Sequence, residues 1–218
     1  MSTTTYLQAV NDVLSRLREP TVTTVNQNSY SRLIGTLVND AKREIEDAYD
    51  WNALSSTVTV STVADTYNYT LPDAKTRFRV IDVLNDTGNW FVRYAPTSWM
   101  NAQFLLTTTS KGSPQYYNFN GVDSNGDTQV DVFPIPDGVY TLRFNLTIPQ
   151  DNLTTDSTRI LVPGHVVSQL AYAKAVAERG EDAGITSVEA YSLYRGSLAD
   201  AIAIERNHYI EETVWTSI

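Results

Sequence analysis

Few side chains in this sequence are of the types that carry out chemistry. Cysteine is absent, which excludes disulfides, thiolate nucleophiles and thiolate metal ligands. The two histidines, His165 and His208, are far apart and lack the spacing at which two imidazoles bind one zinc ion. A Ser–His pair would have to use one of them, and His165 lies at an expected helix start, where a surface role is the simpler interpretation. We therefore predict no enzyme activity, no metal site and no cofactor.

The acidic loop Asp123–Asp127 is the segment that most resembles a metal site. Oxygen-bearing side chains at its first, third and fifth positions match a calcium-binding EF-hand loop. However, Thr128 stands at the sixth position, which requires glycine, and Pro134 stands at the twelfth, which requires glutamate. Because Asn125-Gly126 is a strong turn signal, we interpret this loop as the tip of a β-hairpin.

Aromatic side chains are frequent, with thirteen tyrosines and four tryptophans. Six aromatic residues gather in the middle of the chain: Trp90, Trp99, Phe104, Tyr116, Tyr117 and Phe119. They indicate either an aromatic core or a protein interface, because interfaces are enriched in Tyr and Trp. A third interpretation is a carbohydrate-binding or wall-degrading surface. Its paired carboxylates would come from Asp82, Asp131 and Asp137, and such pairs are defined only by their spacing in three dimensions.

The elements that position these side chains begin with two amphipathic helices between Tyr6 and Trp51. Pro20 ends the first helix, and Asn28 or Ser29 caps the second. The apolar stripe of the first helix contains Tyr6, Leu7, Val10, Val13, Leu14 and Leu17. That of the second contains Tyr30, Leu33, Ile34, Leu37, Val38, Ala41, Ile45, Ala48 and Tyr49. Two helices leave part of these stripes uncovered, so we expect other segments to complete a bundle.

The middle of the chain has the alternating pattern of β-strands. About seven short strands are expected, with one short helix at 97–106, and this pattern is typical of a small sandwich or barrel. The expected strands are 57–63, 67–71, 77–84, 90–94, 115–119, 128–133 and 139–148. Within this set, 90–94 is expected to pair with 77–84 as a hairpin.

Helical periodicity returns after a polar connector. A helix with small residues at Ala171, Ala173, Ala175 and Ala177 is expected to end at Gly180. A capping box at Thr186–Glu189 begins the last helix. We predict an α+β fold in which N- and C-terminal helices form a bundle and an antiparallel β-sandwich or barrel domain is inserted between them. The predicted segments are 1–54, 55–148, 149–207 and 208–218.

Composition and charge further restrict the class of protein to which this chain can belong. The 218 residues are 42% hydrophobic and 19% charged, as in a globular protein, and no apolar run approaches the length of a membrane span. The formal net charge is −9, which argues against gripping nucleic-acid phosphates but not against a repelling channel for DNA. Residues 148–218 hold much of this excess, with ten acidic and five basic side chains.

The last ten residues alternate acidic and large apolar side chains. We expect this tail to anchor on a neighbouring subunit or a partner, because large apolar residues outside a core need a surface on which to dock. The predicted anchors are Tyr209, Ile210, Val214, Trp215 and Ile218.

The run AVNDVLSRLREPTV (Ala9–Val22) resembles the opening of the head-to-tail adaptors of short-tailed bacteriophages, also called tail tubular protein A. In those proteins a similar helix and turn precede a long helix that ends near a tryptophan, as at Trp51 here. Arg18 stands where that pattern commonly has glycine, and Thr21 where it has a second proline. A fainter likeness, LVPGH at 161–165, resembles the start of the family's C-terminal helices.

This resemblance implies a virion structural protein, made in the host cytoplasm, that forms a ring, usually of twelve copies, between the portal and the tail nozzle or tail-tube protein. DNA would pass through the ring without specific binding. An acidic lining would repel phosphates, and the expected channel-facing residues are Glu178, Glu181, Asp182, Glu189 and Asp200. Two alternatives stay open: another connector protein, such as a stopper or tail-completion protein, and the carbohydrate-binding or wall-degrading protein above.

Overall fold

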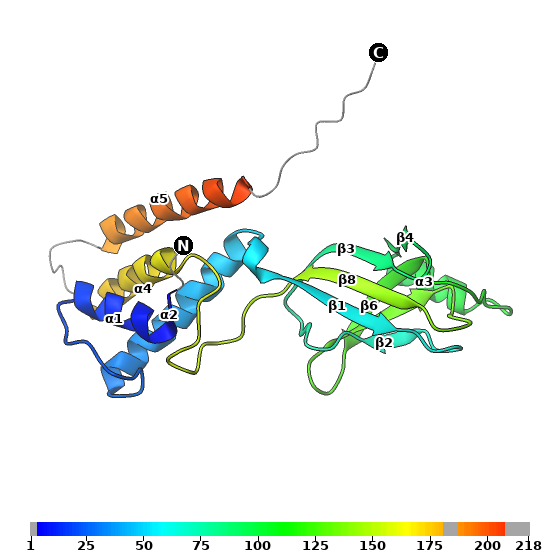
Figure 1. Cartoon of the computed structure of the whole chain (residues 1–218), viewed down its shortest axis with the longest axis horizontal. Helices are drawn as coiled ribbons and strands as arrows, with labels where there is room; N and C mark the ends of the chain where they lie inside the picture. The colour runs from blue at the N-terminus through cyan, green and yellow to red at the C-terminus, as the bar shows by residue number, and fades with distance from the viewer. Residues whose placement is uncertain (1–3, 181–186, 208–218) are drawn as a thin grey trace, which may run out of the picture. The chain divides into compact units, whose positions relative to one another are not determined.

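A computed structural model describes residues 4–180 and 187–207. The chain divides into two compact units: a helical unit, residues 1–54 with 149–218, and a β unit, residues 55–148 (Figure 1). Helices flank the β region in the sequence, so the predicted α+β class is confirmed.

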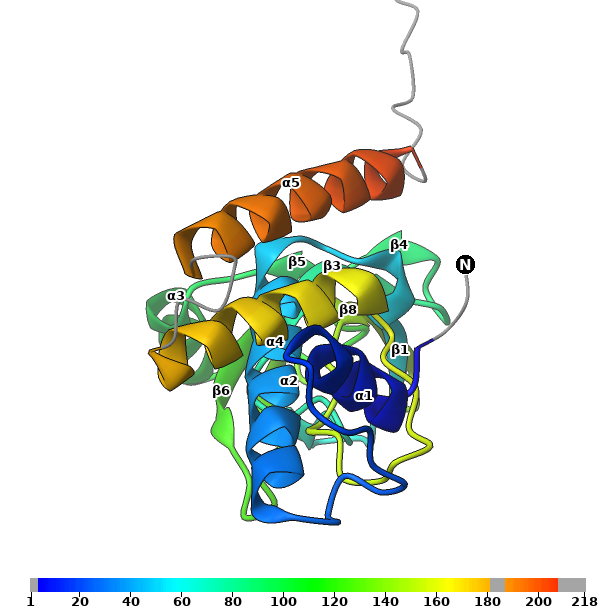
Figure 2. The same ribbon diagram turned by 90° about the vertical axis from the view of Figure 1, so that its left-hand side faces the viewer.

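Helix α4 is central to the helical unit. It contacts each of the other three described helices of that unit (Figure 2). Ala171 and Ala173 are fully buried and Ala175 is nearly so, because small side chains allow helices to approach closely. The predicted small-residue face ends there, since Ala177 is exposed. The elements of the unit are α1 (Tyr6–Arg16), α2 (Ser29–Ala48), the 3-10 turn η1 (Asn52–Leu54), α4 (Gly164–Arg179) and α5 (Ser187–Arg206).

Local sequence signals begin and end these helices. Thr5 caps α1 and Asn28 caps α2, each in a reciprocal capping box. After α1, Arg18 adopts a left-handed φ of 58°, and the amides of Arg18 and Glu19 donate to the Ser15 and Leu14 carbonyls. This is a Schellman turn, in which glycine is the usual residue at the left-handed position. Arg18 therefore departs from the adaptor pattern in residue type but takes a conformation that glycine favours.

The core of the helical unit follows the predicted apolar stripes. Side chains from α1, α2 and α4 are fully buried: Ala9, Val10, Val13, Ile34, Val38, Ala41, Ile45, Val166, Val167 and Leu170. Helices α1 and α2 pass closely at Gly35, where a Cβ atom would clash with Tyr6 and Val25. Ala48, which we expected on the buried face of α2, is exposed, whereas Lys42 and Glu46 are buried.

The β unit consists of two four-stranded sheets with the orders β1-β8-β3-β4 and β2-β7-β6-β5. All strand pairs are antiparallel except β5–β6. The strands of the first sheet are β1 (Ser55–Ser61), β8 (Thr141–Thr147), β3 (Arg79–Asn85) and β4 (Trp90–Phe91). Those of the second are β2 (Asn68–Thr70), β7 (Thr128–Phe133), β6 (Tyr116–Val122) and β5 (Arg93–Tyr94).

The two sheets share one apolar core, so the β unit is a sandwich. Phe144 of β8 meets Tyr117 of β6 across it, with ring centroids 6.1 Å apart. The outer face of the second sheet is covered at one end by α3 (Thr97–Phe104), whose Trp99 packs on Phe133 of β7. Val130 and Val132 of β7 therefore face the sandwich core, whereas Phe133 faces the smaller core under α3.

The predicted strand 90–94 is not a single hairpin partner of 77–84. Its first half, β4, pairs with β3, and its second half, β5, pairs in parallel with β6 in the other sheet. The change occurs at Val92, whose side chain is buried in the sandwich core. The alternating pattern correctly predicts extended chain, but a pattern of period two does not reveal which sheet an edge strand joins.

Candidate interaction site

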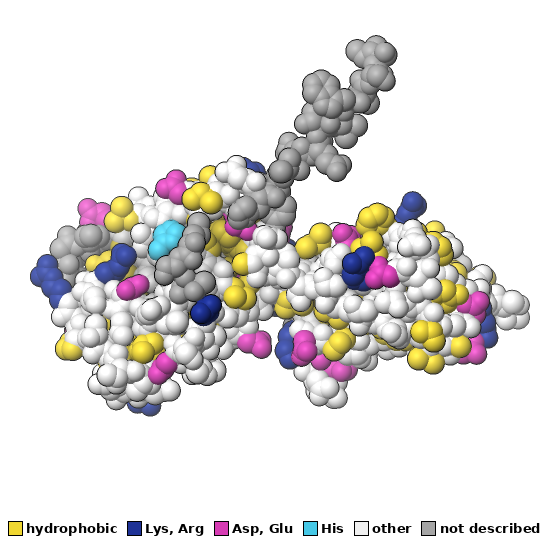
Figure 3. All heavy atoms as spheres, in the orientation of Figure 1, with side chains coloured by type: hydrophobic (Ala, Val, Ile, Leu, Met, Phe, Trp, Pro, Cys, Tyr) yellow, Lys and Arg dark blue, Asp and Glu magenta, His cyan; other side chains and the backbone are white. Residues whose placement is uncertain are grey.

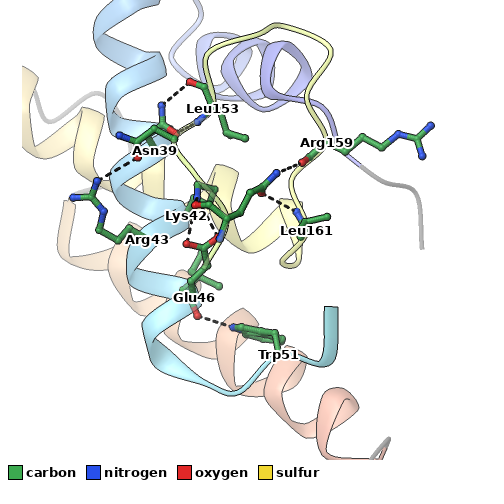
Figure 4. A network of polar contacts seen from close by, with 11 residues as sticks. Asn39, Lys42, Arg43, Glu46, Trp51, Leu153, Arg159 and Leu161 are labelled. Atoms are coloured by element: carbon green, nitrogen blue, oxygen red, sulfur yellow. Dashed lines mark hydrogen bonds and ion pairs between the residues drawn. The ribbon is translucent and has the colours of Figure 1, made fainter. Parts of the chain in front are cut away.

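A buried polar cluster on α2 holds the connector through which the chain returns from the β unit (Figure 4). Lys42 Nζ lies 3.1 Å from Glu46 Oε1, and both side chains are almost completely buried. Lys42 also donates to the Gln150 carbonyl at 2.6 Å, and the Gln150 amide donates to Glu46 at 3.2 Å. These bonds offset the desolvation of both charges. We call Lys42, Glu46 and Gln150 the polar clamp.

Further bonds extend the clamp along the connector. Asn39 of α2 pairs with both backbone groups of Leu153, at 2.7 and 3.1 Å. The Gln150 side chain donates to the Arg159 carbonyl at 2.7 Å. Nearby, the buried Trp51 indole donates to the Ile45 carbonyl at 2.7 Å (Figure 4). The cluster therefore fixes the path of the connector within the helical unit.

The segment that carries the family resemblance lines a hollow of about 620 Å³ in the helical unit. Its walls include Glu19 and Val22 of the turn after α1, Tyr30 of α2 and Arg179 of α4. Arg179 pairs with Glu19 at 3.3 Å, and its guanidinium carbon lies 5.8 Å from the centre of the Tyr30 ring. The turn is thereby linked to the end of α4.

Three of the five predicted channel residues are described by the structure. Glu178, Glu189 and Asp200 are all exposed, whereas Glu181 and Asp182 lie outside the described residues. Glu189 and Asp200 are eleven residues apart on α5, which is about three helical turns and places them on one side of the helix. Arg195 and Arg206 are also exposed on α5, and Figure 3 shows acidic and basic side chains interspersed over the helical unit.

All five predicted tail anchors, Tyr209, Ile210, Val214, Trp215 and Ile218, lie outside the described residues. His208 lies outside them as well, and His165 is exposed in the first turn of α4.

The aromatic residues of the β unit divide into a packed group and an exposed group. Trp99, Phe104, Tyr116, Tyr117 and Phe119 take part in ring contacts within the unit. Burial raises the pKa of the Tyr117 hydroxyl, and the neighbouring Tyr94 raises it further, so Tyr117 stays neutral at physiological pH. Trp90 is the exception, with 39% of its surface exposed.

Trp90 belongs to an exposed surface that sequence reasoning did not identify. Phe91 and Tyr94 are 63% and 59% exposed, and neither was among the predicted aromatic group. A depression of about 360 Å³ lies here, lined by Trp90, Phe91, Arg93, Gln115 and Tyr116. We call it the edge groove, because β4 and β5 are edge strands of the two sheets. Three aromatic residues within five positions, Trp90, Phe91 and Tyr94, were the available signal in the sequence.

The acidic residues considered for chemistry in the β unit have structural partners. Asp82 accepts a hydrogen bond from Asn145, Asp137 from Tyr140, and Asp131 from two asparagine side chains. The Asp123 carboxylate accepts the amides of Asn125 and Asp127 and so holds the predicted hairpin tip. None of these bonds brings two of the proposed carboxylates together. Across residues 4–180 and 187–207, no group of three or more His, Cys, Asp or Glu side chains is placed to hold a metal ion.

The fold and these surfaces define an α+β protein whose distinctive features are contact surfaces and a clamped connector. The family model of the SU10 adaptor protein matches residues 4–214, and the chain belongs to this family of bacteriophage head-to-tail adaptors. The match confirms the resemblance seen in Ala9–Val22. The chain is thus a structural protein of the phage virion, and its family is not a class of enzymes.

No curated protein matches the chain significantly. Among the helices that the structure describes, none combines the length and apolarity needed to cross a membrane.

Proposed function

We propose that this protein forms a ring, of twelve copies in the virion, between the portal and the tail nozzle or tail-tube protein. Its family membership over residues 4–214 carries this proposal. Two compact units joined by a clamped connector suit a protein that must contact different neighbours at once. The helical unit would contact neighbouring subunits and the portal, and the β unit would contact the next tail component.

In this proposal, each of the segments predicted from the sequence makes a different contact. Residues 1–54 and 149–207 build the ring and portal contacts, residues 55–148 meet the tail, and residues 208–218 anchor on a neighbouring subunit or partner. Support for the first role comes from the hollow lined by the family-like turn, which offers a concave surface on the helical unit.

The channel role rests on charge. Glu178, Glu189 and Asp200 are exposed, and two basic side chains of α4 are neutralised by surface ion pairs: Lys174 with Glu44 at 2.6 Å and Arg179 with Glu19 at 3.3 Å. A surface of this kind repels DNA phosphates, so DNA would slide through the channel without specific contacts.

Negative-stain imaging of the purified chain mixed with its portal tests the proposal. We expect twelve-fold rings stacked on portal rings, and the chain alone in the same buffer serves as the control. Portal rings that stay bare at saturating adaptor concentration would contradict the proposed position.

A further inference from the structure

The edge groove combines a cation with one aromatic side chain, Trp90, that is held in a fixed position. We call the Trp90 ring the aromatic wall. The Trp90 indole donates to the Pro114 carbonyl at 3.1 Å, and its ring packs against Gly88. Asn85, fully buried, donates to the same carbonyl at 3.2 Å and accepts the Gly88 amide at 2.9 Å. The wall is therefore held in place before any partner binds, which lowers the entropy lost on binding.

Arg93 supplies the charge of the groove. It is exposed, and no acidic side chain of the described residues forms an ion pair with it. The other lining residues are uncharged: Trp90, Phe91, Gln115 and Tyr116. An occupant with an acidic group beside a large apolar side chain would match this surface.

The groove also lies where both sheets end. β4 is the last strand of the first sheet and β5 the last strand of the second. Edge strands present unpaired backbone groups, with which an extended peptide can form hydrogen bonds. The groove is thus suited to a segment of extended chain.

Residues 208–218, HYIEETVWTSI, have the matching chemistry. They contain two adjacent acidic residues, Glu211 and Glu212, and no lysine or arginine. Trp215 follows three positions after Glu212, a distance of about 10 Å in extended chain. The segment also lacks proline and glycine and is rich in β-branched residues, which favour strand pairing.

We propose that residues 208–218 of one copy bind the edge groove of the neighbouring copy, with Trp215 against the aromatic wall and Glu211 and Glu212 near Arg93. The segment and the groove are different surfaces, so the contact is head-to-tail. A repeated head-to-tail contact closes a ring when its rotations add up to a full turn. The inference rests on the proposed ring and names one of its subunit contacts.

Cysteine cross-linking tests the contact, because the natural chain has no cysteine and therefore no background. Two full-length variants, Gln115→Cys and Val214→Cys, carry different tags and are mixed with portal under mild oxidation. We expect a disulfide between the two tagged chains. The matched control is Val139→Cys in place of Gln115→Cys, since Val139 is 72% exposed outside the groove.

Each outcome of this experiment decides a separate point. Rings on the portal without a Gln115–Val214 cross-link overturn the inference and leave the proposed function standing. A third variant carries both cysteines in one chain, and a disulfide that forms in this variant but not between the two tagged chains overturns the neighbouring copy as the occupant. Absence of rings contradicts the proposed function, and the groove is then decided by peptide binding.

Peptide binding uses a fluorescently labelled synthetic peptide of residues 208–218 and the full-length chain with Trp215→Ala, which weakens competition from its own segment. We expect saturable binding that falls at least tenfold in Arg93→Glu and returns when Glu211 and Glu212 of the peptide are changed to lysine. Arg195→Glu, a charge reversal on α5, serves as the control. Equal affinity for the parent and the Arg93→Glu variant overturns the inference.

Discussion

Lys42 and Glu46 form an ion pair one turn apart on α2, at a separation of 3.1 Å and with side chains 2% and 1% exposed. Such a pair is usually confined to the surface, because removing both charges from water is costly. Here the backbone of Gln150 forms hydrogen bonds with both side chains. The ion pair therefore binds a segment that is more than a hundred residues away in the sequence.

Glu46→Ala should destabilise the helical unit by about 3–5 kcal/mol, because it leaves the Lys42 charge buried without its carboxylate. Replacing both residues, as Lys42→Met with Glu46→Leu, should recover more than half of the loss. Urea unfolding followed by helical circular dichroism measures both. Lys174→Ala, which breaks the exposed pair with Glu44, should cost less than about 1 kcal/mol. Equal losses for Glu46→Ala and Lys174→Ala would show that the clamp does not stabilise the fold.

Gly35→Ala should lower the free energy of unfolding by about 1–3 kcal/mol, because its Cβ would overlap Tyr6 and Val25 where α1 and α2 meet. Gly196 provides a matched control in another helix, since no atom lies within 4 Å of a Cβ built there. Gly196→Ala should stabilise α5 by about 0.5–1 kcal/mol. Thermal unfolding of the two variants should therefore shift in opposite directions, and shifts of the same sign would contradict the close approach at Gly35.

Arg18→Gly should leave stability unchanged or raise it by up to about 1 kcal/mol, because glycine adopts the left-handed conformation at φ 58° without strain. Arg18→Val should be destabilising, since a β-branched residue resists this conformation. Chemical denaturation of both variants measures the difference. A valine variant as stable as the glycine variant would mean that the turn relaxes to another conformation.

Reversing Glu178, Glu189 and Asp200 to lysine should slow genome ejection, because cations on a channel wall attract phosphates. The delay should shrink as salt concentration rises, since salt screens these contacts. Ejection from purified virions, followed by a DNA-binding dye, gives the rate. Lysine at Asp12, Asp40 and Asp151, all exposed in the helical unit, makes the same change in total charge and serves as the control. Ejection unchanged in the triple variant would remove these residues from the proposed channel.

Helix periodicity and capping residues were sufficient to predict that helices flank the β region. The first turns of α1 and α2, and the left-handed Gly180 after α4, follow local signals that act within a few residues. The burial of Lys42 and Glu46 could not be predicted, because it depends on the backbone of a distant connector. In the sequence, a charged residue beside an apolar stripe has the same pattern whether its charged group reaches water or bonds to a buried carbonyl.

The β unit shows the same limit in another form. Alternation predicted strands at 77–84 and 90–94, but a bulge leaves Ile81 56% exposed, and the chain changes sheets at Val92. Both features depend on which strands become neighbours, which is a long-range outcome. The edge groove results from that change of sheet. The sequence contains Phe91 and Tyr94, but it does not reveal that they lie on an exposed edge of the sandwich.

The pairing of β1 with β8 has a consequence for how adaptors can diversify. Ser55 lies opposite Thr147, so the first and last residues of the sandwich are cross-strand neighbours with Cα atoms about 5 Å apart. A two-residue turn could span that gap and bypass the whole sandwich, leaving α2 and the clamped connector joined as before. The β unit is therefore attached as a cassette, one that a phage could exchange for another sandwich without rebuilding its helical unit.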